Sequence, residues 1–379
     1  MDISDKFIIV AGHVTEAYGP VQAVKNYLAK KTDDLLYITH PFTYSKLEGS
    51  AAEFYIKGKQ DRVHRAHKRG KSQFIQWIKD ILFNIGFIRK QKKKAGLFVA
   101  LNNLNALSGI ILKKTGRVEK VAYYIIDHTA RRFKNPLFNF IYENVDKWAL
   151  KGSDYVWILS ERMAEAKKKK FRFDHSKIII VPVGMELDKI DRYTREEKLS
   201  KKTMILMGML DKTKGVQLMI EAMGDIVNEV PGAKLLIIGT GPYEGELKKL
   251  AQGMESIEFT GAMEHDEVFR FIPHHRIGLA PYMDDPNSYT YYADPTKPKE
   301  YLGCGLPLII TDVPWIAEEV KKRPMGIVCR YVKEELVKSC IKLLDDDEFY
   351  GECLKNSEEF ASGLSWDKIY DETLKKMEN

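Results

Sequence analysis

Short apolar runs rich in β-branched residues alternate with longer amphipathic stretches along the whole chain. Continuous runs of four to seven apolar residues are typical of strands buried on both faces, as in a parallel sheet covered by helices. A polar stretch at 184–200 separates six such runs from six more. The predicted strands are 7–12, 35–40, 96–101, 121–127, 155–160, 177–183, 203–208, 234–239, 257–261, 277–281, 307–311 and 326–330. This pattern predicts an α/β protein with two Rossmann-like, doubly wound domains that face each other across a cleft.

Length and composition fit that organisation. A chain of 379 residues suits two domains, which we expect over 1–185 and 186–364, and a hydrophobic content of 44% is typical of a folded globular protein. The start MDISDKFIIVAGH lacks the basic region and the long apolar core of a signal peptide, so we expect a cytoplasmic location. The sequence contains no run of 18 apolar residues, so we do not expect a membrane-spanning helix. The four cysteines lack metal-site spacing and read as buried thiols: Cys304, Cys329, Cys340 and Cys353.

The net charge of +7 is concentrated in one segment, because residues 57–94 hold thirteen Lys and Arg against two Asp. Inside it, 72–88 has the apolar spacing of an amphipathic helix. An apolar face framed by cations fits the surface of an anionic membrane, and we expect the contact residues to be Phe74, Trp77, Ile78, Ile81, Arg89, Lys90, Lys92 and Lys93. Two alternatives remain open: a core helix with a basic, solvated flank, and nucleic-acid binding through 57–94, which we do not expect because no known nucleic-acid module surrounds it.

Two strand-to-helix junctions of the second domain carry features of an anion site. In MGMLDKTKG (207–215), Gly208 follows a strand and Lys214 stands where a helix begins. A lysine at a helix N-terminus opposes the helix dipole unless an anion lies between them. In LLIIGTGP (235–242), Gly239 and Gly241 allow close approach of a ligand to the backbone, and Gly261 ends the next strand. A solvated lysine and plain tight turns are the alternatives.

A third junction lies in ADPTKPKEYLGCGLPLIITD (293–312), where Lys297 and Glu300 open a helix after a strand. A carboxylate at that place can accept the two hydroxyl groups of a ribose, while Lys297 and the helix N-terminus face a phosphate. A capped surface helix is the simpler interpretation of this junction alone. The agreement of three neighbouring junctions favours a nucleotide site.

The ordered blocks MG-x5-KG, LLIIGTGP, FTG and KEYLGCGLPLIITD resemble family 4 of the retaining, type-B (GT-B) nucleotide-sugar glycosyltransferases, the glycosyltransferases of group 1. The resemblance extends to VPVGMEL at the expected hinge and to SWDKIYDETLKKM, similar to a closing helix that crosses back to the first domain over 365–379. It implies that Lys214 binds the donor phosphate and Glu300 the ribose. It further implies retention of configuration without a metal ion or other cofactor.

The chain departs from the family pattern at two positions. Where the family often has an arginine after the first glycine, this chain has Met209, and where it often has a second glutamate, it has Tyr292. We expect Asp294 to take over the sugar contact, and Lys297 or Lys299 to restore the lost charge. The alternative is a catalytically inactive protein that binds nucleotide sugars.

The first domain offers a candidate acceptor side. Gly12 and Gly19 are expected to bracket a loop that, by resemblance, faces the diphosphate and the acceptor. Asp127 and His128 leave the carboxyl end of a predicted strand, and Arg131 follows closely. The resemblance places a histidine near the sugar, so His128 and Asp127 are the catalytic candidates, although a histidine after a strand is often structural.

These observations predict a hexosyltransferase-type glycosyltransferase. We expect its donor to be a UDP- or GDP-linked sugar, and its acceptor to be a hydroxyl group of a glycan or a lipid-linked molecule. The basic helix suggests a role in glycolipid or envelope polysaccharide synthesis, with the protein peripheral on the inner face of the membrane.

Overall fold

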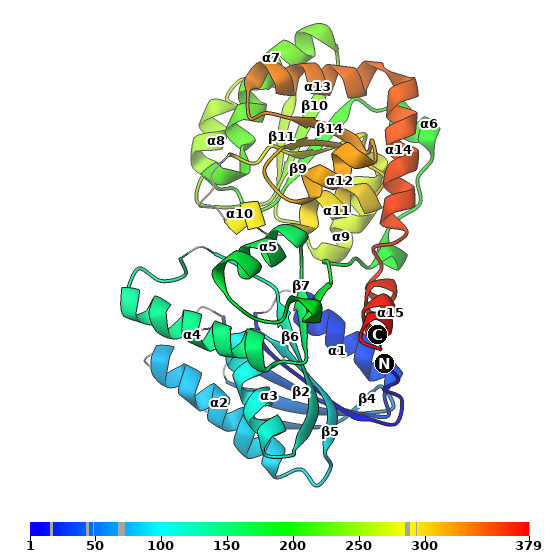
Figure 1. Cartoon of the computed structure of the whole chain (residues 1–379). Helices are drawn as coiled ribbons and strands as arrows, with labels where there is room; N and C mark the ends of the chain where they lie inside the picture. The colour runs from blue at the N-terminus through cyan, green and yellow to red at the C-terminus, as the bar shows by residue number, and fades with distance from the viewer. Residues whose placement is uncertain are drawn as a thin grey trace. The chain divides into compact units, whose positions relative to one another are not determined.

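The structure, a computed structural model, describes residues 1–15, 18–42, 45–47, 49–66, 73–129, 131–284, 289–292 and 294–378. The chain divides into two compact units (Figure 1). The first unit comprises Met1–Pro182 and Trp366–Asn379, and the second comprises Val183–Ser365. The first boundary thus falls three residues before the one predicted from the sequence, and the second falls one residue after it.

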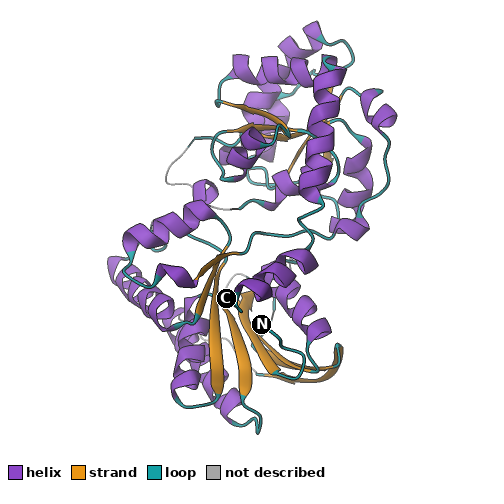
Figure 2. Cartoon of the chain, turned by 45° about the vertical axis from the view of Figure 1, so that its right-hand side comes forward, coloured by secondary structure: helices purple, strands orange, loops and turns teal. Residues whose placement is uncertain are grey.

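The first unit contains an eight-stranded sheet in the order β4-β3-β2-β1-β5-β6-β7-β8. Its six parallel strands are β1 (Phe7–Val14), β2 (Asp34–Pro41), β5 (Ala95–Leu101), β6 (Val118–Ile125), β7 (Tyr155–Ile158) and β8 (Ile178–Ile180). All six were predicted. They are nearly continuous apolar runs because helices cover both faces of the sheet (Figure 2).

The sequence pattern missed an antiparallel hairpin at one edge of this sheet, formed by β3 (Ala51–Ile56) and β4 (Lys59–Arg65). Every residue of β4 is exposed, so the strand has no buried face to produce an apolar alternation. Charged side chains on an edge strand discourage pairing with other chains. Part of the basic charge of 57–94 therefore belongs to a sheet edge and not to the helix that follows.

Six α-helices surround the first sheet: α1 (Pro20–Lys31), α2 (Gln73–Arg89), α3 (Asn103–Lys114), α4 (Pro136–Gly152), α5 (Glu161–Lys170) and α15 (Trp366–Lys376). The chain also forms the short 3-10 helix η1 (His175–Lys177). The closing helix α15 returns to pack on α1 (Figure 1). There the Tyr27 hydroxyl donates to Asp371 at 2.5 Å, and the Tyr27 and Tyr370 rings lie 5.2 Å apart.

The second unit has a six-stranded, fully parallel sheet in the order β11-β10-β9-β12-β13-β14. The strands are β9 (Thr203–Met207), β10 (Lys234–Ile238), β11 (Ile257–Gly261), β12 (Ile277–Ala280), β13 (Leu308–Thr311) and β14 (Gly326–Cys329). All six were predicted. The helices are α6 (Arg195–Leu199), α7 (Val216–Glu229), α8 (Glu244–Leu250), α9 (His265–Phe271), α10 (Tyr289–Tyr292), α11 (Thr296–Gly303), α12 (Ile316–Lys322), α13 (Lys333–Asp345) and α14 (Asp347–Ala361), with 3-10 helices η2 (Leu187–Lys189), η3 (Lys212–Lys214) and η4 (Ile272–His274).

Two cores sandwich this sheet, and β9 contributes to both of them. Met204 and Leu206 pack against the helices of one face, mainly α7, α13 and α14, while Ile205 and Met207 pack against α9, α11 and α12 on the other. Successive side chains of a strand point to opposite faces, so a central strand of this kind must be apolar throughout.

Each sheet has a point at which the strand order reverses. In the first unit β1 lies between β2 and β5, and in the second unit β9 lies between β10 and β12. At such a point the loops leave in opposite directions and open a crevice at the carboxyl ends of the strands, where α/β proteins bind ligands. Both units have a pocket at this place.

Candidate functional site

The pocket of the second unit lies at the carboxyl ends of β9 and β12 and has a volume of about 280 Å³. It is lined by Leu206, Met207, Gly208, Met209, Lys214, Leu279, Ala280, Pro281, Tyr282, Thr290, Pro295, Thr296 and Lys297. Among the predicted donor residues, this set includes Gly208, Lys214 and Lys297. The structure therefore brings two cations from separate junctions to one apolar-walled pocket.

Lys214 is positioned by the glycine that follows it. Gly215 has a φ of +72° and connects the short helix η3 to α7. A Cβ atom on Gly215 would lie 1.8 Å from the carbonyl oxygen of Pro281, at the end of β12. The backbone must therefore pass very close to β12, which holds Lys214 in the pocket with its Nζ 5.3 Å from the ring centre of Tyr282.

The helix α11 is fixed to the same crevice by Tyr301. This fully buried side chain passes under Gly278 of β12, and its hydroxyl accepts a hydrogen bond of 2.6 Å from the Met207 N–H at the end of β9. The first turn of α11 then carries Lys297, whose Nζ donates to Glu300 at 2.8 Å. Glu300 is buried and engaged in this ion pair, one turn behind the pocket wall.

The predicted glycines of the neighbouring loops serve mainly to pack backbone against backbone. A Cβ on Gly239 would lie 2.0 Å from the Gly208 oxygen, and one on Gly241 would lie 2.3 Å from the Leu210 oxygen. The Gly239 N–H donates to the carbonyl oxygen of Gly261 at 2.7 Å. Gly239, Gly241 and Gly261 thus tie three successive strand ends together and are not among the described residues that line the pocket.

The two positions that depart from the family pattern have different surroundings. Met209 lines the pocket with 57% of its surface exposed, so a neutral side chain stands where the family often has an arginine. Tyr292 lies in α10, half-buried, with its ring 5.1 Å from Tyr291, and is not among the described lining residues.

Asp294 does not face the pocket, in contrast to the expectation that it contacts the sugar. Its buried carboxylate forms an ion pair with Lys299, and it accepts a hydrogen bond from the Val183 N–H at 2.8 Å. Lys299 donates in turn to the Val183 oxygen at 2.9 Å. Because both partners are held by the first residue of the second unit, this pair anchors the start of that unit. Lys299 therefore supplies no charge to the pocket.

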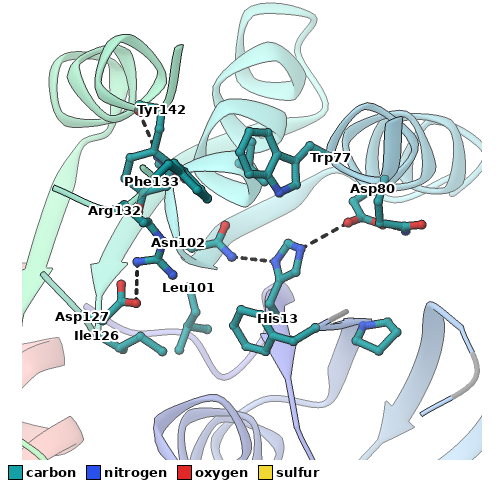
Figure 3. A pocket seen from close by; sticks show the side chains of 15 residues that line it. His13, Trp77, Asp80, Leu101, Asn102, Ile126, Asp127, Arg132, Phe133 and Tyr142 are labelled. Carbon is teal, nitrogen blue, oxygen red and sulfur yellow. Dashed lines mark hydrogen bonds and ion pairs between the residues drawn. The ribbon is translucent and has the colours of Figure 1, made fainter. Parts of the chain in front are cut away.

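The pocket of the first unit lies at the carboxyl ends of β1, β5 and β6, and it has a volume of about 210 Å³ (Figure 3). One wall is aromatic, made by Trp77 of α2, Phe133 and Tyr142, with the Trp77 and Phe133 rings 5.5 Å apart. Its polar groups come from the strand ends and from α2: His13, Asp80, Asn102, Asn103, Asp127 and Arg132. Aromatic faces beside amides and a paired Arg and Asp suit a ring that carries hydroxyl groups.

A buried histidine–aspartate pair, which was not predicted from the sequence, lies at the base of this pocket. His13 Nε2 lies 3.1 Å from Asp80 Oδ2, and His13 Nδ1 accepts from the Asn102 amide at 2.6 Å (Figure 3). The ring is therefore neutral, with its proton on Nε2. Burial lowers the pKa of His13; burial alone would raise the pKa of Asp80, but hydrogen bonds from His13 and His40 hold it well below its usual range.

Two patterns in the sequence could have revealed this pair. Gln76, Asp80 and Asn84 recur every four residues within the apolar stretch of α2, so they share one side of the helix. The segment LNNLNALSG (101–109) places several asparagines directly after a buried strand. Among these, Asn102 adopts a φ of +97°, which is rare for a residue other than glycine and indicates backbone strain at the pocket.

The loop after β6 carries the predicted catalytic candidates. Asp127 lines the pocket and binds Arg132 at 2.6 Å. Arg131, which was predicted to act there, instead donates to the Phe133 and Lys134 carbonyl oxygens, at 3.1 and 2.6 Å. The cation at the pocket is thus Arg132, the neighbour of the residue predicted.

His128 lies in a small adjoining pocket, together with Asp127, Asp146, Lys167 and Lys170. Burial, followed by the charge of Lys167, lowers its pKa to about 4, while Asp146 and Asp127 act in the opposite direction. His128 is therefore neutral at physiological pH and can exchange hydrogen bonds with a sugar without carrying charge.

We expect this burial to make the stability of the first unit depend on pH. The unfolded chain takes up the His128 proton near pH 6.5, whereas the folded chain does so near pH 4. The free energy of unfolding should therefore decrease as the pH falls from 6.5 toward 4, with no His128 contribution above that range. A His128→Asn variant should show a weaker decrease than the wild type. An NMR titration midpoint near 6.5 for His128 would contradict this expectation.

The structure before α1 differs in one respect from the loop that Gly12 and Gly19 were expected to bracket. Gly12 is a residue of β1, not of a loop, because β1 continues to Val14. A Cβ on Gly12 would lie 2.6 Å from Val21 Cγ1, so this glycine brings α1 close to the sheet. Gly19 precedes α1, and its N–H donates to the Gln22 side chain at 3.1 Å. Neither glycine is among the described residues that line the pocket.

Comparison with known proteins agrees with this architecture. The family model described as "Glycosyl transferases group 1" matches residues 201–346, which hold the β9–β12 pocket and the blocks identified in the sequence. An uncharacterized glycosyltransferase of Methanocaldococcus jannaschii is 26% identical over 72% of this chain and 72% of its own. The resemblance to the group 1 glycosyltransferases is confirmed.

Other relatives of this chain have more specific names. The alpha-monoglucosyldiacylglycerol synthase of Streptococcus pneumoniae is 25% identical over 39% of this chain and 35% of its own. A GDP-mannose-dependent mannosyltransferase of Corynebacterium glutamicum, which acts on a monoacylated phosphatidylinositol monomannoside, is 24% identical over 62% of this chain and 55% of its own.

Solved structures confirm the fold. Sucrose-phosphate synthase from Thermosynechococcus elongatus superimposes with a TM-score of 0.69 at 16% identity, covering 98% of each chain. HepE of Anabaena, solved with UDP, gives 0.68 at 11% identity, covering 98% of this chain and 99% of its own. The predicted GT-B class, with Rossmann-like α/β domains, is therefore confirmed.

Proposed function

We propose that this glycosyltransferase transfers a sugar, with retention of configuration and without a metal ion, from a nucleoside diphosphate sugar to an acceptor hydroxyl group. The observation that carries the proposal is the β9–β12 pocket, where Lys214 and Lys297 stand beside the N-terminal ends of α7 and α11. Cations and free backbone N–H groups together form a diphosphate site. UDP or GDP is the proposed nucleotide, in line with the ligand of the HepE structure and the name of the mannosyltransferase relative.

The chemistry assigns separate tasks to the residues of this pocket. The bond from the anomeric carbon to the β-phosphate oxygen breaks, and a bond from that carbon to the acceptor oxygen forms. Negative charge then builds on the departing diphosphate, where Lys214 and Lys297 stabilise it. Glu300 holds the ribose hydroxyl groups, which requires Lys297 to leave its present ion pair and turn to the phosphate.

The pocket of the first unit is the proposed acceptor site, with Asp127 and His128 orienting the sugar or the acceptor. The names of two relatives refer to lipid glycosides, which supports a role in glycolipid or envelope polysaccharide synthesis. No helix in the described part of this chain is long and apolar enough to cross a membrane. We propose a peripheral location on the inner face of the membrane, in line with the lipid glycosides in the names of these relatives.

A second candidate function rests on Met209. A neutral side chain at the pocket weakens the hold on the diphosphate, which favours a protein that binds nucleotide sugars without transferring them. Such a protein responds to the donor in binding experiments but neither transfers nor hydrolyses the sugar.

A thermal-shift titration with UDP, GDP, ADP and their common sugar conjugates tests the proposal. A nucleotide at 100 times its dissociation constant should stabilise the protein by about 2.7 kcal/mol. We expect one diphosphate to stand out and its nucleoside to have little effect. If no nucleotide shifts the transition, the donor assignment is wrong; if one binds but its sugar is neither transferred nor hydrolysed, the inactive alternative holds. An oligonucleotide in the same assay tests the nucleic-acid alternative.

A further inference from the structure

Two helices of the first unit expose a row of large apolar side chains. The α2–α4 face consists of Phe74, Ile75, Ile78 and Leu82 of α2 and Leu137, Phe140 and Trp148 of α4, each between 39% and 66% exposed. Both helices begin on the same side of the unit (Figure 1), and the ring contact of 6.4 Å between Trp77 and Phe138 connects the second turn of α2 to the first turn of α4. A concentration of exposed apolar side chains on two connected helices indicates an interaction surface.

The charges beside this face identify its partner. Exposed lysines interrupt or follow the apolar positions on both helices: Lys79 on α2, Lys134 just before α4, and Lys147 and Lys151 along α4. Arg89 and Lys90 at the end of α2 are also exposed. Apolar and aromatic side chains among cations complement the surface of an anionic bilayer, where the rings enter the interface and the lysines meet the head groups.

The inner side of α2 belongs to the unit and fixes the orientation of this face. Asp80 and Asn84 are buried in the polar network with His13 and His40, and Ile88 is buried in the core. Trp77 and Ile81, which were predicted to contact the membrane, are partly buried, and Trp77 contacts Phe133 and Phe138. The predicted contacts Phe74 and Ile78 are exposed. Lys93 forms an ion pair with Asp34 at the start of β2.

The pocket of the first unit lies on the other side of α2 from this face. Gln76, Trp77 and Asp80 of α2 line that pocket, while their neighbours Ile75 and Ile78 are exposed on the α2–α4 face. A bilayer on the face is therefore separated from the pocket by the width of α2, about 10 Å. A lipid head group that extends past α2 by this distance can reach Trp77 and Arg132 while its acyl chains stay in the membrane.

We propose that the α2–α4 face docks on an anionic bilayer, with α4 as a second membrane-binding helix, and that the acceptor is a membrane lipid whose hydroxyl-bearing head group enters the Trp77–Arg132 pocket. This inference rests on the proposed function for the transfer step. The docking step is supported by the exposed apolar and basic residues of the α2–α4 face alone.

Flotation of the full chain with vesicles of phosphatidylcholine and about 30 mol% phosphatidylglycerol tests the docking step. We expect the double variants Phe140→Ser/Trp148→Ser and Lys147→Glu/Lys151→Glu each to weaken partitioning by about tenfold or more. Their side chains are exposed on α4, so the thermal transition of the protein should not change. Leu250→Ser/Val332→Ser and Lys248→Glu/Lys249→Glu, which change exposed residues of the second unit, serve as matched controls.

The outcomes separate this inference from the proposed function. Unchanged partitioning of both α4 variants overturns the docking proposal even if the nucleotide titration succeeds. A dimer in light scattering that the Phe140→Ser/Trp148→Ser change dissociates also overturns it, because the face is then a protein interface. Labelled sugar recovered in the lipid phase of vesicles that contain a monoglucosyl diacylglycerol, and reduced in the α4 variants, supports the acceptor class. Nucleotide binding with transfer only to water-soluble sugars contradicts it.

Discussion

Replacing Lys299 with methionine should destabilise the second unit by about 3–5 kcal/mol, the usual cost of removing one partner of a buried ion pair. The Asp294 carboxylate is buried, and Lys299 is the cation that compensates its charge. Lys299 also donates to the Val183 oxygen, so its loss leaves a buried acceptor without that donor. Urea unfolding combined with hydrogen exchange on peptides of β9 and β12 measures the effect in the second unit.

A pH series gives this expectation a distinctive signature. Burial raises the pKa of Asp294, and without Lys299 the folded variant favours the protonated acid even more strongly. The folded state then binds more protons than the unfolded state above pH 3.8, so the stability of Lys299→Met should fall as the pH rises from about 4 to neutrality. Adding Asp294→Asn should remove this slope and restore part of the stability.

The control is an exposed ion pair in the same unit. Lys321 binds Asp312 at 2.6 Å, with about half of each side chain exposed. Lys321→Met should cost about 0–1 kcal/mol because solvent screens the pair. Similar losses for Lys299→Met and Lys321→Met would show that the buried pair does not anchor the unit.

The framework of the fold could be predicted because its strands are buried on both faces. Twelve apolar runs correspond to twelve parallel strands, and the helix-length segments between them leave few other arrangements. The β3–β4 hairpin escaped this reasoning for the opposite reason. Its outer strand is exposed along its whole length, so its conformation depends on pairing with β3 and not on a buried face.

The candidate site could be predicted where neighbouring residues of one strand-to-helix junction form the pattern. Lys214 with Gly215, and Lys297 with Glu300, are local patterns, and both cations reach or border the β9–β12 pocket. Asp294 shows the limit of such reasoning, because its partner Lys299 and the Val183 backbone meet it only in the folded unit. A carboxylate near a ligand site in the sequence can equally be a structural anchor.

The first unit shows the same limit over longer distances. His13 and Asp80 are 67 residues apart, and Asp80 lies in a helix whose apolar stripe suggested a membrane role. The helix has two tasks, since one side holds the polar network and the other remains exposed. Sequence periodicity detects that the helix is amphipathic, but which side faces the protein depends on the sheet that it packs against.

Replacing Lys214 with methionine should weaken the binding of a nucleoside diphosphate by about 10- to 100-fold, which corresponds to the roughly 1.5–3 kcal/mol of a hydrogen bond to a charged group. Methionine keeps most of the length and the apolar stem of the side chain, and Gly215 keeps the turn, so the change removes mainly the ammonium group. Binding of the uncharged nucleoside should change little. Isothermal titration at two salt concentrations measures both ligands, and the loss should be smaller at high salt, where the wild-type lysine is screened.

Lys212 provides a matched control, because it lies on the same short helix, η3, but is exposed and does not line the pocket. Its Nζ stands 5.4 Å from the ring centre of Tyr243. Lys212→Met should therefore leave diphosphate affinity within about twofold of the wild type, since a distant exposed charge is screened. Equal losses for the two variants would mean that the diphosphate senses the net charge of the turn. A loss confined to Lys214→Met means that this ammonium group contacts the phosphate, which is the contact that charge stabilisation in the transfer step requires.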